Sequence, residues 1–277
     1  MDSNSRDWLR EQLIDVLSQQ NEIFQIFSFG REVEERVDAF SDLDIIVCSS
    51  DLAQTQNTFK SVISTISPIV GTYIIESSTD NLSEMIMLRG YSPYQKIDFS
   101  IVNDIELKKR LGFGPLSLIY ENGQAQRQSR SVLDVVEIPH TINQLNDLLF
   151  SVPRFTKCLF RADIDMYRRW KSSSDLALVL LYERYYGWDA TGSRKKISAK
   201  EANILYKGLN QEDSSLLEAI FPITGQLSIA ASYVLCIDLL IELSKQKAEF
   251  FELEANDELI RYVRTFLDIE IGRIQVE

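Results

Sequence analysis

The chain has 277 residues, of which 45% are hydrophobic and 25% charged, with only 11 glycines and 6 prolines. This composition is typical of a globular protein and excludes collagen-like, low-complexity and broadly disordered classes. The single histidine, His140, excludes zinc sites with two imidazoles, and the three widely spaced cysteines argue against a disulfide framework or a thiolate metal site. No G-x-S-x-G motif is present, so any chemistry is expected to fall to carboxylates.

The charge balance points to cationic partners. The 29 lysines and arginines against 41 aspartates and glutamates give a formal charge of −12, which disfavours nucleic acid and anionic membranes as partners. The first residues contain no apolar leader, and the most apolar run, 227–243, contains two acidic residues, so we expect a buried helix there rather than a membrane span. We expect a cytoplasmic monomer or homodimer with reduced thiols.

The two halves of the chain have different hydrophobic patterns. In chain order, the first half predicts a helix at 6–20, a strand at 23–29, a charged helix or loop at 31–38, a strand at 43–48, a helix at 53–66, strands at 70–76, 85–89 and 96–102, a helix at 104–111 and a strand at 117–120. The second half predicts helices at 141–150, 154–186, 198–207, 212–220, 226–251 and 256–273. The predicted fold is α+β: a small mixed sheet flanked by helices at 1–138, followed by an all-helical domain at 139–277.

Three aspartates lie on predicted neighbouring strands. Asp42 and Asp44 are two residues apart at the start of a strand, so they are expected to project from one face. Asp98 lies between Ile97 and Phe99 in a later strand and is expected to face away from those apolar neighbours. If the strands are adjacent, three carboxylates converge. The alternatives are that Asp42 only belongs to a turn that leads into its strand, and that Asp98 only marks the edge of a sheet.

Three converging carboxylates require a cation. Oxygen ligands of this kind suit Mg²⁺, which keeps coordination positions open for the phosphate oxygens of a nucleoside triphosphate. Gly30, at the end of the first predicted strand, allows backbone N–H groups to approach a phosphate closely.

This arrangement resembles the nucleotidyltransferase superfamily that includes DNA polymerase β, and within it the aminoglycoside 6-adenylyltransferases that modify streptomycin. The family's strand-Gly-Ser, Asp-x-Asp and Ile-Asp-Leu elements are similar to Gly30-Arg31, Asp42-Leu43-Asp44 and Ile97-Asp98-Phe99. A family helix with Pro, Lys, Arg and an acid at the same spacing is matched by Pro153, Lys157, Arg161 and Asp163. The resemblance extends over most of the chain up to about residue 190.

The resemblance implies that AMP is transferred from ATP to a hydroxyl of a small cationic acceptor, an aminoglycoside such as streptomycin, and that pyrophosphate leaves. Asp42 and Asp44 would hold Mg²⁺, with Asp98 as the third ligand or as the general base. Asp163 is the alternative general base, because an acidic residue removes the acceptor proton in the resembling enzymes.

The resemblance also implies phosphate contacts. Ser28, Gly30 and Arg31 would surround the triphosphate, although the family has serine where this chain has Arg31. That arginine either grips the phosphates itself or marks a weakened site. Lys157 and Arg161 lie one helical turn apart and either reach the triphosphate or form a solvated basic face.

Two further functions stay open on the sequence. One is a catalytically weakened or regulatory protein that keeps the nucleotidyltransferase fold. The other is the same chemistry on a lincosamide or on a protein hydroxyl rather than on an aminoglycoside. The resemblance to the aminoglycoside-modifying enzymes implies a role in antibiotic resistance. Glu76 and Glu84 are candidates for an acidic acceptor pocket.

Overall fold

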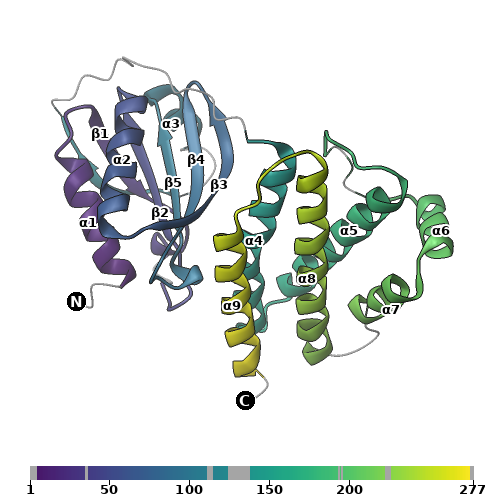
Figure 1. Ribbon diagram of the computed structural model, residues 1–277. Helices are drawn as coiled ribbons and strands as arrows, with labels where there is room; N and C mark the ends of the chain where they lie inside the picture. The colour runs from purple at the N-terminus through teal and green to yellow at the C-terminus, as the bar shows by residue number, and fades with distance from the viewer. Residues whose placement is uncertain are drawn as a thin grey trace. The chain divides into compact units, whose positions relative to one another are not determined.

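The computed structural model describes residues 5–34, 37–110, 115–123, 138–192, 194, 196–221 and 226–274. The chain divides into two units, Met1–Ile138 and Pro139–Glu277, the first a sheet with helices and the second helical (Figure 1). None of the helices in these ranges combines the length and the hydropathy that a bilayer crossing requires.

The first unit is built around one mixed sheet. Its elements in chain order are α1 (Arg6–Ser18), β1 (Ile23–Ser28), the 3-10 turn η1 (Gly30–Glu32), β2 (Leu43–Ser49), α2 (Leu52–Ile66), β3 (Ile69–Ser78), β4 (Asn81–Leu88), the 3-10 turn η2 (Pro93–Gln95), β5 (Ile97–Val102), α3 (Asp104–Arg110) and β6 (Ser117–Glu121). The six strands in the described ranges are ordered β3-β4-β5-β2-β1-β6. Among these six described strands, β2 and β5 pair in parallel and the other four pairs are antiparallel. The predicted fold class, a mixed sheet flanked by helices with a helical region after it, is confirmed.

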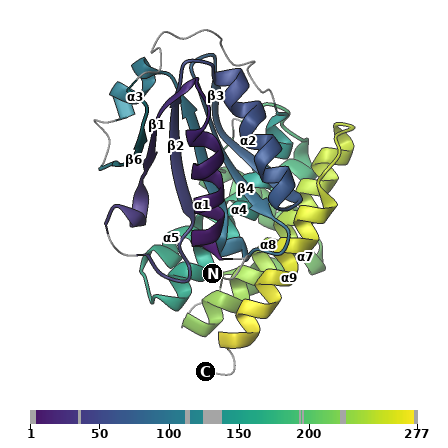
Figure 2. The same ribbon diagram turned by 90° about the vertical axis from the view of Figure 1, so that its left-hand side faces the viewer.

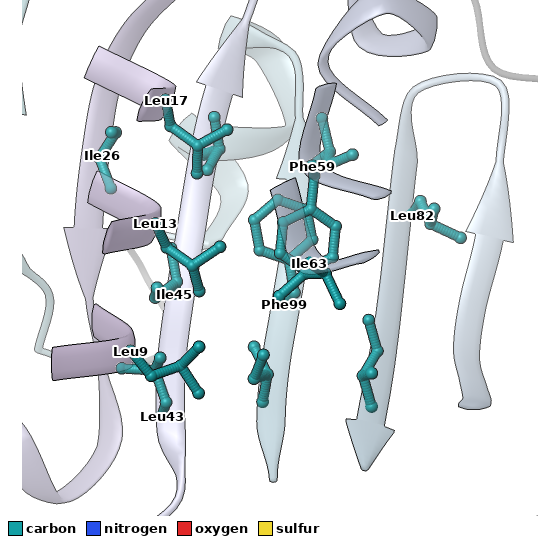
Figure 3. Close-up of a cluster of buried hydrophobic side chains, with 14 of the residues drawn as sticks. Leu9, Leu13, Leu17, Ile26, Leu43, Ile45, Phe59, Ile63, Leu82 and Phe99 are labelled. Atoms are coloured by element: carbon teal, nitrogen blue, oxygen red, sulfur yellow. The ribbon is translucent and has the colours of Figure 1, made fainter. Parts of the chain in front are cut away.

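The main core lies between the sheet and two helices, α1 and α2, which lie side by side over the strands in Figure 2. Leu9, Leu13 and Leu17 recur every four residues along α1, so they form one apolar stripe, and all three are fully buried (Figure 3). Phe59 of α2 stacks on Phe99 of β5 with ring centroids 3.4 Å apart. Each fully buried side chain of this size contributes roughly 1.5–3 kcal/mol, so this layer fixes the sheet beneath it.

The opposite face of the sheet has a smaller apolar cluster, to which α3 contributes Leu107. The other members come from β1, β2 and β5: Phe24, Phe27, Ile46, Cys48 and Val102. Successive residues of a strand point to opposite faces of the sheet. The strand residues that lie between members of the main core therefore point to this second face. It is the face that carries the candidate site.

The second unit consists of helices in the part of the chain that the structure describes. They are α4 (His140–Phe160), α5 (Asp165–Tyr186), α6 (Ala199–Gly208), α7 (Gln211–Ile220), α8 (Gln226–Phe250) and α9 (Asp257–Ile274). Phe155 of α4 stacks on the fully buried Tyr233 of α8, with centroids 3.5 Å apart. Lys247 of α8 forms a buried ion pair of 2.7 Å with Glu183 of α5. These contacts join three of the helices around one core.

The predicted break between residues 150 and 154 is wrong. The helix α4 continues through Pro153, which lies inside it, although proline lacks the N–H that an inner helical turn uses. The chain turns instead at Ala162, whose φ of 51° is left-handed, and the N–H of Asp163 donates to the carbonyl of Cys158 at 2.9 Å. This bond is typical of a Schellman helix end, which usually has glycine at the turning position, so the sequence gives no signal for it.

Candidate active site

Two of the predicted aspartates face each other across the parallel strand pair. Asp44 is the second residue of β2, Asp98 is the second residue of β5, and the register pairs them directly. Their side chains alternate with Leu43 and Phe99, which belong to the main core, so both carboxylates lie on the opposite face of the sheet. Both residues are half-buried. The structure therefore brings these two carboxylates together where β2 and β5 begin.

Asp42 lies two residues before Asp44, on the same face of the sheet, and is held by two contacts. Its backbone carbonyl accepts a 2.9 Å hydrogen bond from Nε of Arg6, whose Nη2 donates to Glu32 at 2.7 Å. Its carboxylate forms an ion pair with the ammonium of Lys96, a side chain that is only 1% exposed. The backbone of Asp42 is thus held by Arg6 of α1, and its carboxylate by the residue before β5.

Gly30 brings the backbone of η1 against one of the facing carboxylates. Its φ is 67°, in the left-handed region that favours glycine. A Cβ at this position would clash with Oδ2 of Asp44 and would lie 3.2 Å from its Cγ. Glycine is therefore required both by the backbone conformation and by the close approach to Asp44.

The other two residues of the predicted phosphate loop differ in their placement. Ser28 is 2% exposed and is in register with Ile45, a member of the main core, so its side chain lies on the face away from Asp44. Arg31 is on the η1 turn beside Gly30, and its guanidinium donates to Asp38 at 3.5 Å. The structure thus keeps Arg31 on the turn that approaches the carboxylates and sets the Ser28 side chain apart from them.

The donor chemistry of this face suits a hard divalent cation. Among the residues that the structure describes, no three His, Cys, Asp or Glu side chains are arranged to hold a metal ion. Asp44 and Asp98 supply carboxylate oxygens, which are the ligands that Mg²⁺ prefers. The pair fits Mg²⁺, and a ligand set of all three aspartates stays a prediction.

The remaining predicted residues lie around the end of α4 in the helical unit. Lys157 is 8% exposed, and the N–H of Arg161 donates to its carbonyl at 3.1 Å, one helical turn later. Asp163 is exposed, and its Oδ1 accepts a 2.9 Å hydrogen bond from the N–H of Asp165 at the start of α5. This carboxylate therefore helps to begin α5, and its role as a general base stays a prediction.

Glu84, a candidate for the acceptor pocket, lies on the wrong face for that role. It is 3% exposed and is in register with Phe99 of the main core, so it points away from the Asp44–Asp98 pair. Burial raises the pKa of its carboxyl above the usual 4.5, and Lys60 of α2 acts in the opposite direction. Its Oε1 has no hydrogen-bond partner in the described ranges. Glu76 forms an ion pair of 3.4 Å with Arg110.

Sequence reasoning missed Lys96. A signal was present, because Lys96 stands two residues before Asp98 and shares its face if the strand extends that far. A charged residue directly before an apolar strand is ordinarily solvated, so only the structure reveals that this one is buried beside Asp42.

No protein family model and no curated protein matches this chain. Among solved structures, the chain is similar to the aminoglycoside 6-adenyltransferase of Bacillus subtilis, with 11% identity, a TM-score of 0.33, and coverage of 95% of this chain and 98% of that one. It is also similar to the spectinomycin adenyltransferase AAD(9) of Enterococcus faecialis, solved with ATP and spectinomycin, with 16% identity, a TM-score of 0.29, and coverage of 86% and 99%.

Proposed function

We propose that this protein is a Mg²⁺-dependent nucleotidyltransferase that moves AMP from ATP to a hydroxyl of a small cationic acceptor and releases pyrophosphate. By the sequence resemblance, the acceptor is an aminoglycoside such as streptomycin. The observation that carries the proposal is the Asp44–Asp98 register together with the closeness of Gly30 to Asp44. A carboxylate pair under a turn that has no side chain at its closest point is the arrangement that a metal-bound triphosphate requires.

In this mechanism Asp44 and Asp98 hold Mg²⁺. When bound, the ion neutralises charge on the triphosphate and orients its phosphates. The backbone of Gly30 leaves space for a phosphate oxygen, and Arg31 beside it supplies a guanidinium that exchanges Asp38 for phosphate. Asp98 or Asp163 accepts the proton of the acceptor hydroxyl.

The net charge supports the acceptor class that the resemblance implies. The chain has a formal charge of −12, and a field of that sign concentrates polycations and repels nucleic acid. An aminoglycoside, with several ammonium groups beside its hydroxyls, suits such a field. We assign the helical unit at 139–277 to acceptor binding and the unit at 1–138 to the nucleotide.

A catalytically weakened protein of the same fold is the second candidate. Two contacts favour it: Arg31 is engaged by Asp38, and Asp42 is engaged by Lys96. An active enzyme would need Arg31 to exchange Asp38 for phosphate, and a metal site that includes Asp42 would also need that carboxylate to turn from Lys96 to the ion.

The test is pyrophosphate release from Mg-ATP with a panel of acceptors. We expect release with streptomycin or another aminoglycoside and none without an acceptor. Release with a lincosamide or a protein substrate alone would contradict the assigned acceptor and keep the chemistry. Mg-dependent ATP binding without release on any acceptor would favour the weakened protein, and Arg31→Ser would then be examined for a gain of activity.

A further inference from the structure

The register divides the sheet face of the candidate site into steps, each formed by residues that lie side by side on neighbouring strands. Asp44 and Asp98 form one step. Ser100 follows Asp98 by two residues in β5, about 7 Å along the strand and on the same face, and Ser83 of β4 is in register with it. Ser83 and Ser100 are 4% and 2% exposed, and their hydroxyl oxygens are 2.8 Å apart. The step beside the carboxylates is therefore polar and buried where β4 meets β5.

Arg110, the last residue of α3, lies over this polar step. Its Nη1 donates to Oγ of Ser100 at 3.2 Å, and its Nη2 donates to Oγ of Ser83 and to Oδ1 of Asn81, both at 3.0 Å. Leu107, one helical turn earlier, packs into the smaller apolar cluster on the same face of the sheet. The helix thus anchors a guanidinium that bridges β4 and β5 next to the Asp44–Asp98 step.

The buried partners of Arg110 are neutral, and its contacts with carboxylates are long. Glu76, whose side chain is 56% exposed, lies 3.4 Å from Nη2. Glu106 lies 3.8 Å from Nε, and its other oxygen binds Lys109 at 2.8 Å. The side chain of Arg110 is 21% exposed, so a ligand can reach one edge of the guanidinium. The charge of Arg110 is therefore held in place by groups that do not neutralise it.

Another arginine of the chain shows a guanidinium with full compensation. Nε and Nη2 of Arg264 donate to the two oxygens of Asp238 at 2.5 and 3.0 Å. Among the described residues, Arg110 has no such two-point contact with a carboxylate. Beside it, Asn81 is 1% exposed, and its Nδ2 has no hydrogen-bond partner in the same part of the chain. The cluster thus has more donors than its own acceptors satisfy, and an anion would restore the balance.

We infer that Arg110 is an anion-binding residue of the candidate site and that its guanidinium contacts a phosphate group of the nucleotide. This inference rests on the proposed function, because that function places a metal-bound triphosphate at Asp44 and Asp98. The phosphate replaces the exposed Glu76 as the outer partner of the guanidinium, while the serines and the asparagine beneath keep it in place. A charge-assisted hydrogen bond to phosphate is shorter and stronger than the 3.4 Å contact that it replaces.

The experiment is a calorimetric titration of the full-length chain with inorganic pyrophosphate in the presence of Mg²⁺. Arg110→Gln removes the charge and keeps a polar side chain, and we expect it to weaken binding about 10- to 100-fold. The matched control is Lys108→Gln, which removes an exposed lysine from the same helix and should change binding by less than about twofold. Equal losses in the two variants, or no loss in Arg110→Gln, would overturn the inference.

Glu76→Gln gives an independent readout of the opposite sign. Because phosphate and Glu76 compete for the same guanidinium, removal of this carboxylate should tighten pyrophosphate binding about two- to fivefold. An Arg110 that only braces the sheet would not produce this gain. The matched control is Asp104→Asn, which removes a carboxylate of α3 that pairs with Lys108 instead. Unchanged or weaker binding in Glu76→Gln would overturn the inference, even if Arg110→Gln does not fold.

The outcomes separate this inference from the proposed function. AMP transfer by the wild type, with equal pyrophosphate binding by wild type and Arg110→Gln, would overturn the inference and leave the proposed function standing. Weaker pyrophosphate binding in Arg110→Gln, with no AMP transfer to any acceptor, would support the anion contact and contradict the transferase activity. No pyrophosphate bound by the wild-type chain would overturn the inference.

Discussion

Each unit of the molecule contains a buried lysine paired with a carboxylate, and the surroundings of the two pairs differ. In the helical unit, Lys247 and Glu183 are 1% and 2% exposed, and the pair links α8 to α5. In the sheet unit, Lys96 is buried equally well, but Asp42 is 22% exposed and lies beside the Asp44–Asp98 step. The same chemistry thus serves as an internal link in one unit and borders a candidate site in the other.

The two pairs differ in the exposure of the carboxylate, which is 2% for Glu183 and 22% for Asp42. In the enclosed pair, Oε2 of Glu183 accepts from the ammonium of Lys247 at 2.7 Å and from the N–H of Asp189 at 3.4 Å. A pair with one exposed partner borders a surface that a ligand can reach.

The largest effect is expected from breaking the enclosed pair. Lys247→Met leaves the Glu183 carboxylate buried without its cation, which should lower the free energy of unfolding by about 3–5 kcal/mol. Chemical denaturation measures this loss, and Lys171→Met, at an exposed pair, should change stability by less than about 1 kcal/mol. Equal effects of the two variants would contradict the structural role of the buried pair.

Next in size is a loss of activity without a loss of stability. Asp44→Asn removes one of the facing carboxylates, and acceptor-dependent pyrophosphate release should fall by about 100- to 1,000-fold. Because Asp44 is half-buried and not part of either core cluster, the denaturation midpoint should stay close to that of the wild type. Activity within a few-fold of wild type would remove Asp44 from the site.

A smaller effect separates backbone strain from the site itself. Gly30→Ala and Gly90→Ala both put a side chain at a positive φ, of 67° and 82°, so each should cost about 1–2 kcal/mol of stability. Only at Gly30 would the new Cβ meet Asp44, whereas nothing lies within 4 Å of the Cβ at Gly90. We expect weaker Mn²⁺ binding for Gly30→Ala alone, and the same weakening in Gly90→Ala would contradict the close approach.

The smallest effect concerns the pH dependence of stability at Glu84. Burial raises the pKa of this carboxyl in the folded chain above 4.5, so the folded state binds more protons than the unfolded state between the two values. Stability from this group is therefore present below pH 4.5 and is lost as the pH rises through the folded pKa. Glu84→Gln should be more stable than wild type at neutral pH and lose the advantage in acid, as urea denaturation at several pH values would show.

The matched control for that prediction is Glu11→Gln, an exposed position on α1. Its denaturation at the same pH values is the reference for removing a carboxylate that is not buried. If Glu84→Gln has the same profile as wild type, the raised pKa is contradicted.

The fold was largely predictable because the patterns were local. The apolar stripe of α1 and the β-branched run of β2 place both elements within two residues of their observed bounds. The strand β4 begins at Asn81 rather than near Met85, because polar residues such as Ser83 and Glu84 lie buried in it and hide the strand pattern. The end of α4 was missed because Ala162 adopts a conformation that its identity does not signal.

The candidate site was predictable only where it depends on alternation along a strand. The facing of Asp44 and Asp98 follows from their strands once β2 and β5 are neighbours. The Lys96–Asp42 ion pair and the side of the sheet on which Ser28 lies depend on how distant segments pair, which one sequence does not contain. Long-range register is therefore what separates the predicted triad from the observed arrangement.

The most direct test of the central claim is mass spectrometry of streptomycin after incubation with Mg-ATP and the full-length protein. The account predicts a product that carries one added AMP with wild type and little or none with Asp44→Asn. Unmodified streptomycin with wild type would contradict the proposed acceptor. The same product in equal yield from Asp44→Asn would contradict a site built on Asp44 and Asp98.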